Sequence, residues 1–233
     1  MKTIGLLGGM SWESTTHYYQ LINEQVKTQL GGLHSAELVM ASVDFAPIEQ
    51  MQRNNLWQEA GELLGQKAQK LELAGAQCLV ICTNTMHKVV PLIDKFISIP
   101  VLHIADATAQ TICHSGITKV ALLGTRFTMQ EDFYKNRLKD KFALDVIVPS
   151  EQQCTQIDTV IFNELCLGKV VKSSQQVYLE IIDELTQRGA QAIILGCTEL
   201  GMLVHQQDTN VPLFDATVIH AQKAVEWALN EEN

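Results

Sequence analysis

The sequence predicts an α/β fold made of two similar domains, each with a mostly parallel sheet. Short apolar runs alternate with longer segments whose apolar residues recur at helical spacing, which is the pattern of parallel sheets covered by helices. Several segments of the first half also recur in the second half in the same order. We therefore expect two domains of similar plan related by a pseudo-two-fold axis; if they face each other across a cleft, a ligand would bind between them.

The clearest repeat pairs AGAQCLVICTNT at residues 74–85 with RGAQAIILGCTE at residues 188–199. Shorter matches pair IGLLGG at 4–9 with VALLGT at 120–125, and Pro100 with Pro212. The alignment places Thr83 on Cys197, so two strand ends present Thr-Asn-Thr and Cys-Thr-Glu. A hydroxyl and a thiol that face one ligand from opposite sides suit chemistry on both faces of a carbon atom.

The individual elements follow from the same periodicities. Apolar runs predict strands at residues 3–7, 37–42, 78–82, 101–103, 120–123, 145–148, 192–195 and 213–214. Helical spacing predicts helices at 14–28, 56–74 and 174–188, and glycine follows the last two, as is common at helix ends. The near-constant offset of the repeats divides the chain into residues 1–117, residues 118–214 and a C-terminal helix at 215–233. We expect that helix to pack back on the first half.

Composition indicates a compact globular chain and excludes some partners. The 233 residues are 46% hydrophobic and 18% charged, which is enough for a sizeable core in one or two domains. A net charge of −9 argues against nucleic acid or an anionic membrane as a partner, but permits a small anion. No apolar stretch approaches the roughly 18 residues of a membrane span, and the first apolar run is too short for a secretory signal. We expect a cytoplasmic protein whose six cysteines are reduced.

Polar residues gather where predicted strands end, which is where parallel α/β sheets bind ligands. The segments are Gly8-Gly9-Met10-Ser11, Thr83-Asn84-Thr85, Thr125-Arg126-Phe127-Thr128 and Cys197-Thr198-Glu199. In any one loop, capping of the next helix is the simpler interpretation. Four loops in matching positions favour a site.

Cys197 is the strongest catalytic candidate. A thiol at a helix N-terminus can have a lowered pKa, and its thiolate would then be a base or nucleophile near neutral pH. The other cysteines fit structural roles. Cys82 remains an alternative because it adjoins Thr83, although the repeat pairs Cys82 with Gly196.

The sequence gives no support for a metal or an organic cofactor. The seven histidines lack metal-ligand spacing such as HExxH, and no CxxC pair is present. Neither GxGxxG nor GxxxxGK[ST] occurs, and no lysine has a recognisable pyridoxal context. His87 stands close enough to Thr85 to tune or relay a proton, or it simply belongs to the start of a helix.

Taken together, these motifs resemble the aspartate/glutamate racemase family of cofactor-independent amino acid racemases. The resemblance covers essentially the whole chain. It rests on Gly8 to Thr15, Asn84-Thr85-Met86-His87, Leu123-Gly124-Thr125 with Thr128-Met129 and Phe133-Tyr134, and Gly196-Cys197-Thr198-Glu199-Leu200. It implies two similar α/β domains with the active site between them, a homodimer, and no pyridoxal phosphate.

The family mechanism implied by this resemblance uses two cysteines on opposite faces of the substrate α-carbon. One thiolate removes the α-proton, and the other thiol returns a proton from the far side. This chain has Thr83 where the family's first-half motif has cysteine, and so resembles the subset with threonine there. A hydroxyl is too weak an acid to serve as a base near pH 7 but can donate a proton. The resemblance therefore implies that Cys197 abstracts and Thr83 donates, with L-aspartate or L-glutamate as the favoured substrate.

By the same analogy, the substrate is held by residues from both halves. Those expected to line the pocket or bind carboxylates are Met10, Gln52, Asn84, Thr85 and Thr198. Lys169 and Arg53 are the candidate cations for a carboxylate, with solvated surface charge as the alternative. Glu199 would hold the substrate ammonium or cap a helix.

Two other functions compete with racemisation. Relatives that keep a single cysteine decarboxylate activated malonates, and release of carbon dioxide would identify that reaction. A non-catalytic protein that binds acidic amino acids is the second alternative, and tight binding without α-proton exchange would identify it. The sequence leaves open the preference between aspartate and glutamate, and the physiological role.

Overall fold

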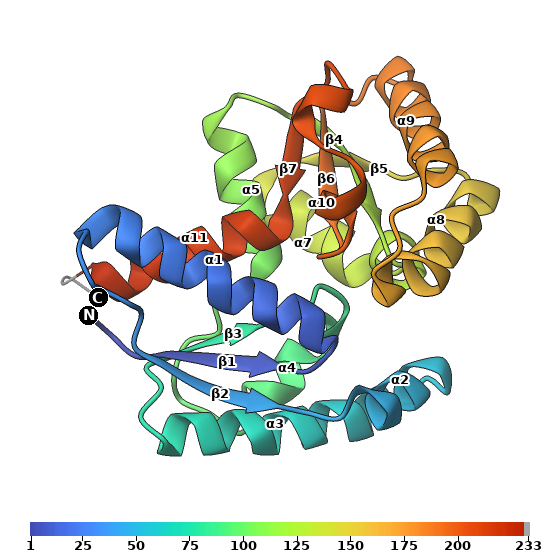
Figure 1. Cartoon of the computed structure of the whole chain (residues 1–233). Coiled ribbons are helices and arrows are strands. Elements are labelled where there is room, and N and C mark those ends of the chain that lie inside the picture. Colours follow the sequence, from blue (N-terminus) through green and yellow to red (C-terminus); the bar gives the residue numbers. More distant parts are fainter. Residues whose placement is uncertain (231–233) are drawn as a thin grey trace. The chain divides into compact units, whose positions relative to one another are not determined.

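The computed structural model describes residues 1–230 and divides the chain into two compact units. The first comprises Met1–His103 together with the chain from His220 onward, and the second comprises Ile104–Ile219. Both are α/β units with parallel sheets, so the predicted fold class is confirmed (Figure 1). The first unit ends before the residue-117 boundary expected from the repeat. Helix α5 (Ile104–His114) is the reason, because its apolar face packs into a core cluster of the second unit.

The first unit contains a parallel sheet with the strand order β2-β1-β3. Its strands are β1 (Ile4–Gly8), β2 (Leu38–Ser42) and β3 (Cys78–Ile81). All five residues of β1 and all four of β3 are buried, as expected for strands covered on both faces. Of the predicted strand at 101–103, only Val101 pairs, through an isolated parallel bridge to Leu79.

Helices cover both faces of this sheet (Figure 1). On one face, α1 (Trp12–Leu30) and the part of α11 (Ala216–Leu229) from Ala221 onward pack against Ile4, Leu6 and Val80. On the other face lie α3 (Trp57–Leu73), the 3-10 helix η1 (Thr85–Val89) and α4 (Val90–Ile93). Helix α2 (Phe45–Arg53) precedes α3 and adds Ile48 to the same core.

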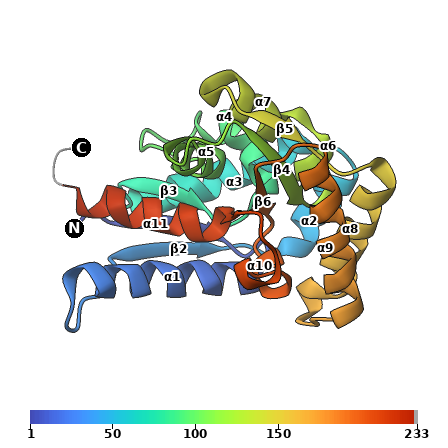
Figure 2. The same cartoon turned by 90° about the horizontal axis from the view of Figure 1, so that it is seen from above.

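The second unit contains a four-stranded parallel sheet with the order β5-β4-β6-β7. Its strands are β4 (Lys119–Gly124), β5 (Asp145–Ile147), β6 (Ala192–Gly196) and β7 (Leu213–Asp215). Helices α5 and α7 (Asp132–Phe142) pack on one face of the sheet, while α8 (Glu151–Asn163) and α9 (Lys172–Gln187) pack on the other. Figure 2 shows α8 and α9 side by side. The shorter elements are α6 (Arg126–Gln130), α10 (Leu200–Leu203) and the 3-10 helices η2 (Leu165–Leu167) and η3 (Gln206–Asp208).

The repeated Gly-Ala-Gln segment has the same structural role in each unit. Gly75 and Gly189 have φ values of 99° and 94°, in the region that favours glycine, and each follows the helix before a buried strand. The side chain of Gln77 accepts a hydrogen bond from the Thr3 backbone N–H at 3.0 Å. That of Gln191 accepts one from the Lys119 N–H, also at 3.0 Å. Each glutamine thereby ties the start of its strand to the neighbouring strand.

The three predicted helices are present, with ends shifted by two residues or fewer. Helix α1 begins at Trp12 rather than at residue 14 because Ser11 is its N-cap and accepts the Ser14 backbone N–H at 3.2 Å. Four further helices of nine or more residues within 1–214 were not predicted: α2, α5, α7 and α8. Helix α11 lies within the expected C-terminal helix.

Candidate functional site

Two polar loops leave the first sheet at the same edge. Strands β1 and β3 are parallel neighbours, with Leu7 in register with Ile81, so the loops that follow them start side by side. In the first loop, Gly9 has φ +95°, and a Cβ there would lie 2.2 Å from the Val43 carbonyl oxygen, so glycine is required. The hydroxyl of Thr15 accepts the Gly9 N–H at 2.8 Å. The hydroxyls of this loop region therefore shape the turn and cap α1.

The second loop, Thr83-Asn84-Thr85, differs from a simple cap. Thr83 is partly exposed, whereas Asn84 and Thr85 are buried. Asn84 stands at the N-cap of η1 but its side chain makes no capping bond. Within the described structure, both Nδ2 and Oδ1 of Asn84 are buried and have no hydrogen-bond partner. An unpaired buried polar group costs about 1–3 kcal/mol, so a side chain with two such atoms points to a ligand.

Other predicted residues of the first unit take different positions. Met10 is buried in the apolar core, and buried Gln52 donates from Nε2 to the Met86 sulfur at 2.9 Å. Arg53 has 74% of its side chain exposed and forms an ion pair with Glu49 one turn earlier on α2. Arg53, a candidate for binding a substrate carboxylate, is therefore already paired with the carboxylate of Glu49.

The corresponding loop of the second unit brings a thiol and a carboxylate together. Cys197 follows β6, and its Sγ–H donates to Glu199 Oε2 at 2.9 Å. The Thr198 hydroxyl donates to the same oxygen at 2.6 Å, and Cys166 Sγ lies 3.9 Å from Oε1. Cys197 and Glu199 are both buried, with 7% of each exposed. A proton acceptor is therefore in hydrogen-bond contact with the thiol and is shielded from solvent.

This contact reverses the expected direction of the Cys197 pKa. We expected a helix N-terminus to lower it, but burial, the charge of Glu199 and the hydrogen bond to its carboxylate raise the pKa of Cys197 well above the usual thiol value. The expectation is wrong because the helix that follows, α10, has only four residues, while Glu199 is a full charge at contact distance. The resting group is a thiol that needs a base.

Two residues that carry this arrangement were not predicted to take part in it. Cys166 was assigned a structural role. Its contact with Glu199 depends on the fold of η2, which no local sequence motif predicts. Glu199 was expected to hold a substrate ammonium or cap a helix. It stands at the N-cap of α10 without a side-chain capping bond and instead accepts from Cys197. Lys169, just after η2, is exposed.

Cys82 lies in the core rather than in the polar loop. It is fully buried among apolar residues of α1, α11 and the first sheet, and its Sγ is 3.9 Å from the Val80 carbonyl oxygen. Burial raises the pKa of this thiol far above the neutral range. These surroundings suit the structural role.

We therefore expect Cys82→Ala to leave catalysis within about twofold of wild type while lowering the free energy of unfolding by about 1 kcal/mol, through the small cavity it creates. Steady-state activity assays and urea unfolding of the two proteins test this. A loss of activity in a variant that remains folded would instead place Cys82 in the reaction.

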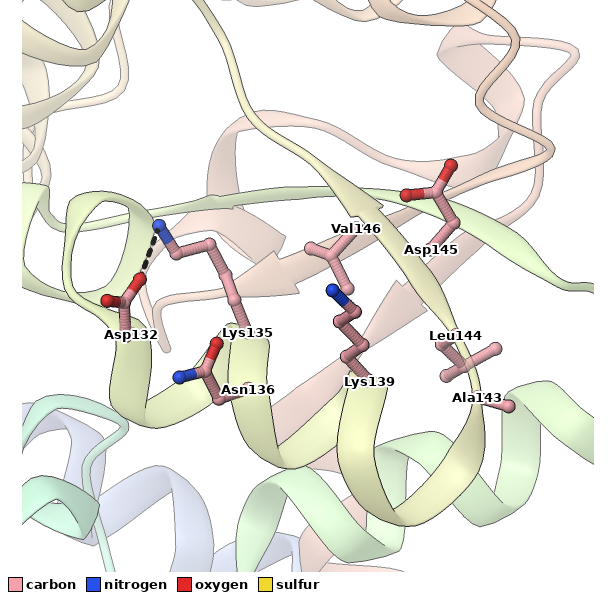
Figure 3. Close-up of a pocket in the computed structure, with 8 residues that line it drawn as sticks. All are labelled: Asp132, Lys135, Asn136, Lys139, Ala143, Leu144, Asp145 and Val146. Carbon is pink, nitrogen blue, oxygen red and sulfur yellow. Dashed lines mark ion pairs between the residues drawn. The ribbon is translucent and has the colours of Figure 1, made fainter.

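A separate pocket of about 530 Å³ lies on the second unit along α7 and the start of β5 (Figure 3). Lys135 and Asp132 form a 3.4 Å ion pair at one side of it. Asp145 is the first residue of β5, so the pocket is at the amino end of that strand, opposite the end where parallel sheets bind ligands. None of the predicted site residues lines it.

Among residues 1–230, no group of three or more His, Cys, Asp or Glu side chains is arranged to hold a metal ion. No helix in the same range is long and apolar enough to cross a membrane.

The structure therefore has two parallel-sheet α/β units, each with a polar loop after a buried strand, where such sheets bind ligands. The model of the Asp/Glu/hydantoin racemase family matches residues 7–224. The chain belongs to this family and is an isomerase of the racemase class.

Individual relatives agree. A solved structure from Yersinia pestis, of a protein classed among Asp/Glu racemases, is 50% identical, covers 99% of this chain and 100% of its own, and has a TM-score of 0.94. An aspartate racemase homologue from Pyrococcus horikoshii is 34% identical, with coverage of 99% and 100% and a TM-score of 0.87. The broad specificity amino-acid racemase RacX of Bacillus subtilis is 24% identical over 95% of this chain and 96% of its own.

Proposed function

We propose that the protein racemises aspartate or glutamate without pyridoxal phosphate, with Cys197 as the base and Thr83 as the acid on opposite faces of the α-carbon. The observation that carries this proposal is the buried Cys197 thiol held 2.9 Å from the Glu199 carboxylate. The names of the Yersinia pestis and Pyrococcus horikoshii relatives support the acidic substrates. RacX is named as a broad specificity racemase, so the range of amino acids that this protein accepts has to be measured by assay.

The proposed cycle balances its protons. Glu199 takes the thiol proton, and the Cys197 thiolate then removes the α-proton of the L-enantiomer to leave a carbanion and a thiol. Thr83 donates its hydroxyl proton to the opposite face and forms the D-enantiomer. The proton left on Glu199 returns to the Thr83 oxygen through solvent. Thr83 never has to act as a base in this direction, which matches the weak acidity of a hydroxyl.

Substrate binding is proposed to use the buried amide of Asn84. Its Nδ2 can donate to a carboxylate, and its Oδ1 can accept from an ammonium group, so an amino acid can satisfy both atoms. Thr85, Thr198, Met10 and Gln52 complete the proposed pocket. Lys169, which is exposed, is the preferred cation for a substrate carboxylate, and Arg53 is less suited because Glu49 already neutralises it.

The proposed preference for L-substrates is a kinetic property and does not change the equilibrium between the enantiomers. The two enantiomers are equal in free energy, so kcat/KM for racemisation must be the same in both directions. The asymmetry belongs instead to the separate kcat and KM values, and to α-proton exchange. A carbanion that returns to Cys197 more often than it inverts gives exchange in the L-substrate, whereas the D-substrate exchanges only as it inverts.

We further propose that the enzyme acts in the cytoplasm as a homodimer, on the basis of the family resemblance. Light scattering coupled to size-exclusion chromatography tests the dimer. A mass equal to one 25.9 kDa chain at assay concentration would contradict it.

The test of the function is chiral chromatography of purified protein incubated with each enantiomer of aspartate and glutamate, with no pyridoxal phosphate added. We expect the opposite enantiomer of at least one acid to appear and approach a one-to-one mixture. Carbon dioxide release from a substituted malonate without racemisation, or tight aspartate binding without α-proton exchange, would contradict the proposal.

The Glu199 contact makes a separate prediction about the thiol. In Glu199→Gln the charge that raises the Cys197 pKa is removed, so the pKa should fall. A fall of one pH unit increases the thiolate fraction about tenfold below the pKa. Iodoacetamide labelling of Cys197, followed by peptide mass spectrometry from pH 6 to 10, measures this shift. Racemisation by the same variant should nevertheless decrease, because the proton acceptor is lost.

Cys113 provides the internal reference for the labelling experiment, because it is exposed and remote in sequence from Glu199. Its labelling profile should be the same in both proteins. An unchanged or raised Cys197 profile in Glu199→Gln would show that the carboxylate does not control the thiol.

A further inference from the structure

We propose that His87 is a positioning residue for Thr83, and that it holds the Thr83 backbone through a neutral imidazole whose tautomer is fixed by the fold. This inference rests on the proposed function of Thr83 as the proton donor. It concerns residues of the first unit alone.

The loop after β3 is tied at two points. The Thr83 N–H donates to the Ile81 carbonyl oxygen at 2.8 Å, which turns the chain sharply at the end of the strand. Nδ1 of His87 lies 2.8 Å from the carbonyl oxygen of Thr83. A carbonyl oxygen only accepts, so Nδ1 must carry the hydrogen. The imidazole of His87 therefore forms a hydrogen bond with the backbone of Thr83, the residue that bears the proposed catalytic hydroxyl.

Two further histidines surround this ring. The His87 ring centroid is 4.6 Å from that of His103 and 5.6 Å from that of His220. His220 Nε2 lies 2.6 Å from the Leu102 carbonyl oxygen and must donate to it, so the Nδ1 of a neutral His220 accepts the Tyr18 hydroxyl at 2.8 Å. The ring hydrogens of His87 and His220 are thus set by two backbone carbonyls, those of Thr83 and Leu102.

Burial keeps His87 and His220 neutral. His87 is 2% exposed and His220 is fully buried, as is Tyr18. Burial and the two neighbouring histidines lower the pKa of His87 well below its ordinary value, and burial lowers that of His220 to about 4. The ring of His87 consequently remains a single Nδ1–H donor to Thr83 throughout the neutral range.

The consequence for catalysis is specific. The bond to His87 fixes the peptide of Thr83, and through it the direction of the hydroxyl. Misplacement of a reacting group by about 1 Å can reduce a rate about 100-fold. Loss of the His87 bond should therefore slow proton return by Thr83 while leaving abstraction by Cys197 intact.

The experiment uses His87→Leu and His87→Asn with L-aspartate in heavy water, followed by proton NMR and chiral chromatography. The measured quantity is the ratio of D-product formed to deuterium gained by the remaining L-substrate. We expect this ratio to fall about tenfold or more in His87→Leu. His87→Asn should recover most of it, because the asparagine amide N–H can replace Nδ1–H, whereas a glutamine amide cannot reach the same position.

His114 provides a matched control. Its Nδ1 also bonds the carbonyl oxygen four residues earlier, Gln110 at 2.6 Å, but it is exposed at the end of α5. His114→Leu should leave the ratio unchanged. Circular dichroism and thermal unfolding of each variant separate loss of fold from loss of positioning, and the ratio itself is insensitive to the fraction of protein that is unfolded.

The double variant Thr83→Ala/His87→Leu distinguishes the proposed role of Thr83 as proton donor from the proposed role of His87 in positioning it. If both hold, the ratio in the double variant equals that of Thr83→Ala. If Thr83→Ala leaves the ratio unchanged, the proposed role of Thr83 fails, and this inference fails with it. If Thr83→Ala lowers the ratio but His87→Leu does not, only the positioning role of His87 is overturned.

Discussion

Cys197→Ser is expected to reduce racemisation of L-aspartate or L-glutamate by about 1000-fold, within the range that a general base contributes. Serine is similar in size to cysteine and can keep the hydrogen bond to Glu199. The loss of activity therefore reports the difference in acidity between the thiol and the hydroxyl. A hydroxyl is a much weaker acid than a thiol, and Glu199 cannot ionise it to a useful extent. Steady-state assays by chiral chromatography measure the effect.

The same substitution should abolish deuterium exchange at the α-carbon of L-substrates, because Cys197 is assigned the abstraction step. Cys113→Ser serves as the control, since this exposed cysteine packs in neither polar loop. Activity of Cys197→Ser within tenfold of wild type would remove this residue from the mechanism.

Thr83→Ala is expected to separate exchange from inversion. The Cys197 thiolate can still remove the α-proton, and Glu199, carrying solvent deuterium, can trade it with the thiol before return to the same face. L-substrate should therefore gain deuterium at a rate within about threefold of wild type while D-product formation falls about 100-fold or more, as expected for loss of one general acid. Proton NMR and chiral chromatography of the same samples measure both rates.

Thr16→Ala controls for the loss of a threonine hydroxyl, because this exposed hydroxyl of α1 donates to the Trp12 carbonyl oxygen at 3.0 Å, within its own helix. It should match wild type in both rates. Equal loss of exchange and inversion in Thr83→Ala would mean that Thr83 supports abstraction as well, contrary to its assignment.

Most of the fold was predictable because the two halves repeat each other and the buried strands are unmistakable in sequence. The Gly-Ala-Gln repeat is a clear case, since Gln77 and Gln191 tie their strands in the same way. The unpredicted helices are different. Helix α7, for example, reads DFYKNRLKDKF and buries only Tyr134 and Leu138, so its apolar periodicity is weak.

The sequence was sufficient to choose candidate residues for the site, but not to predict their electrostatics. Thr83 and Cys197 became candidates because they follow predicted strands, and parallel sheets bind ligands at that end of the strands. The raised pKa of Cys197 could not be foreseen, because it depends on burial and on which way the Glu199 side chain turns. The contact of His87 with the Thr83 carbonyl likewise depends on the short 3-10 turn, which has no sequence signature of its own.

The central claim is that Cys197 abstracts and Thr83 donates, and the most direct test follows both enantiomers of the substrate in heavy water with the wild-type enzyme. Starting from the L-enantiomer, we predict that deuterium enters the remaining L-substrate faster than D-product forms. Starting from the D-enantiomer, deuterium should appear only in the L-product. Deuterium entering unreacted D-substrate as fast as it enters unreacted L-substrate would contradict the assignment of one base and one acid.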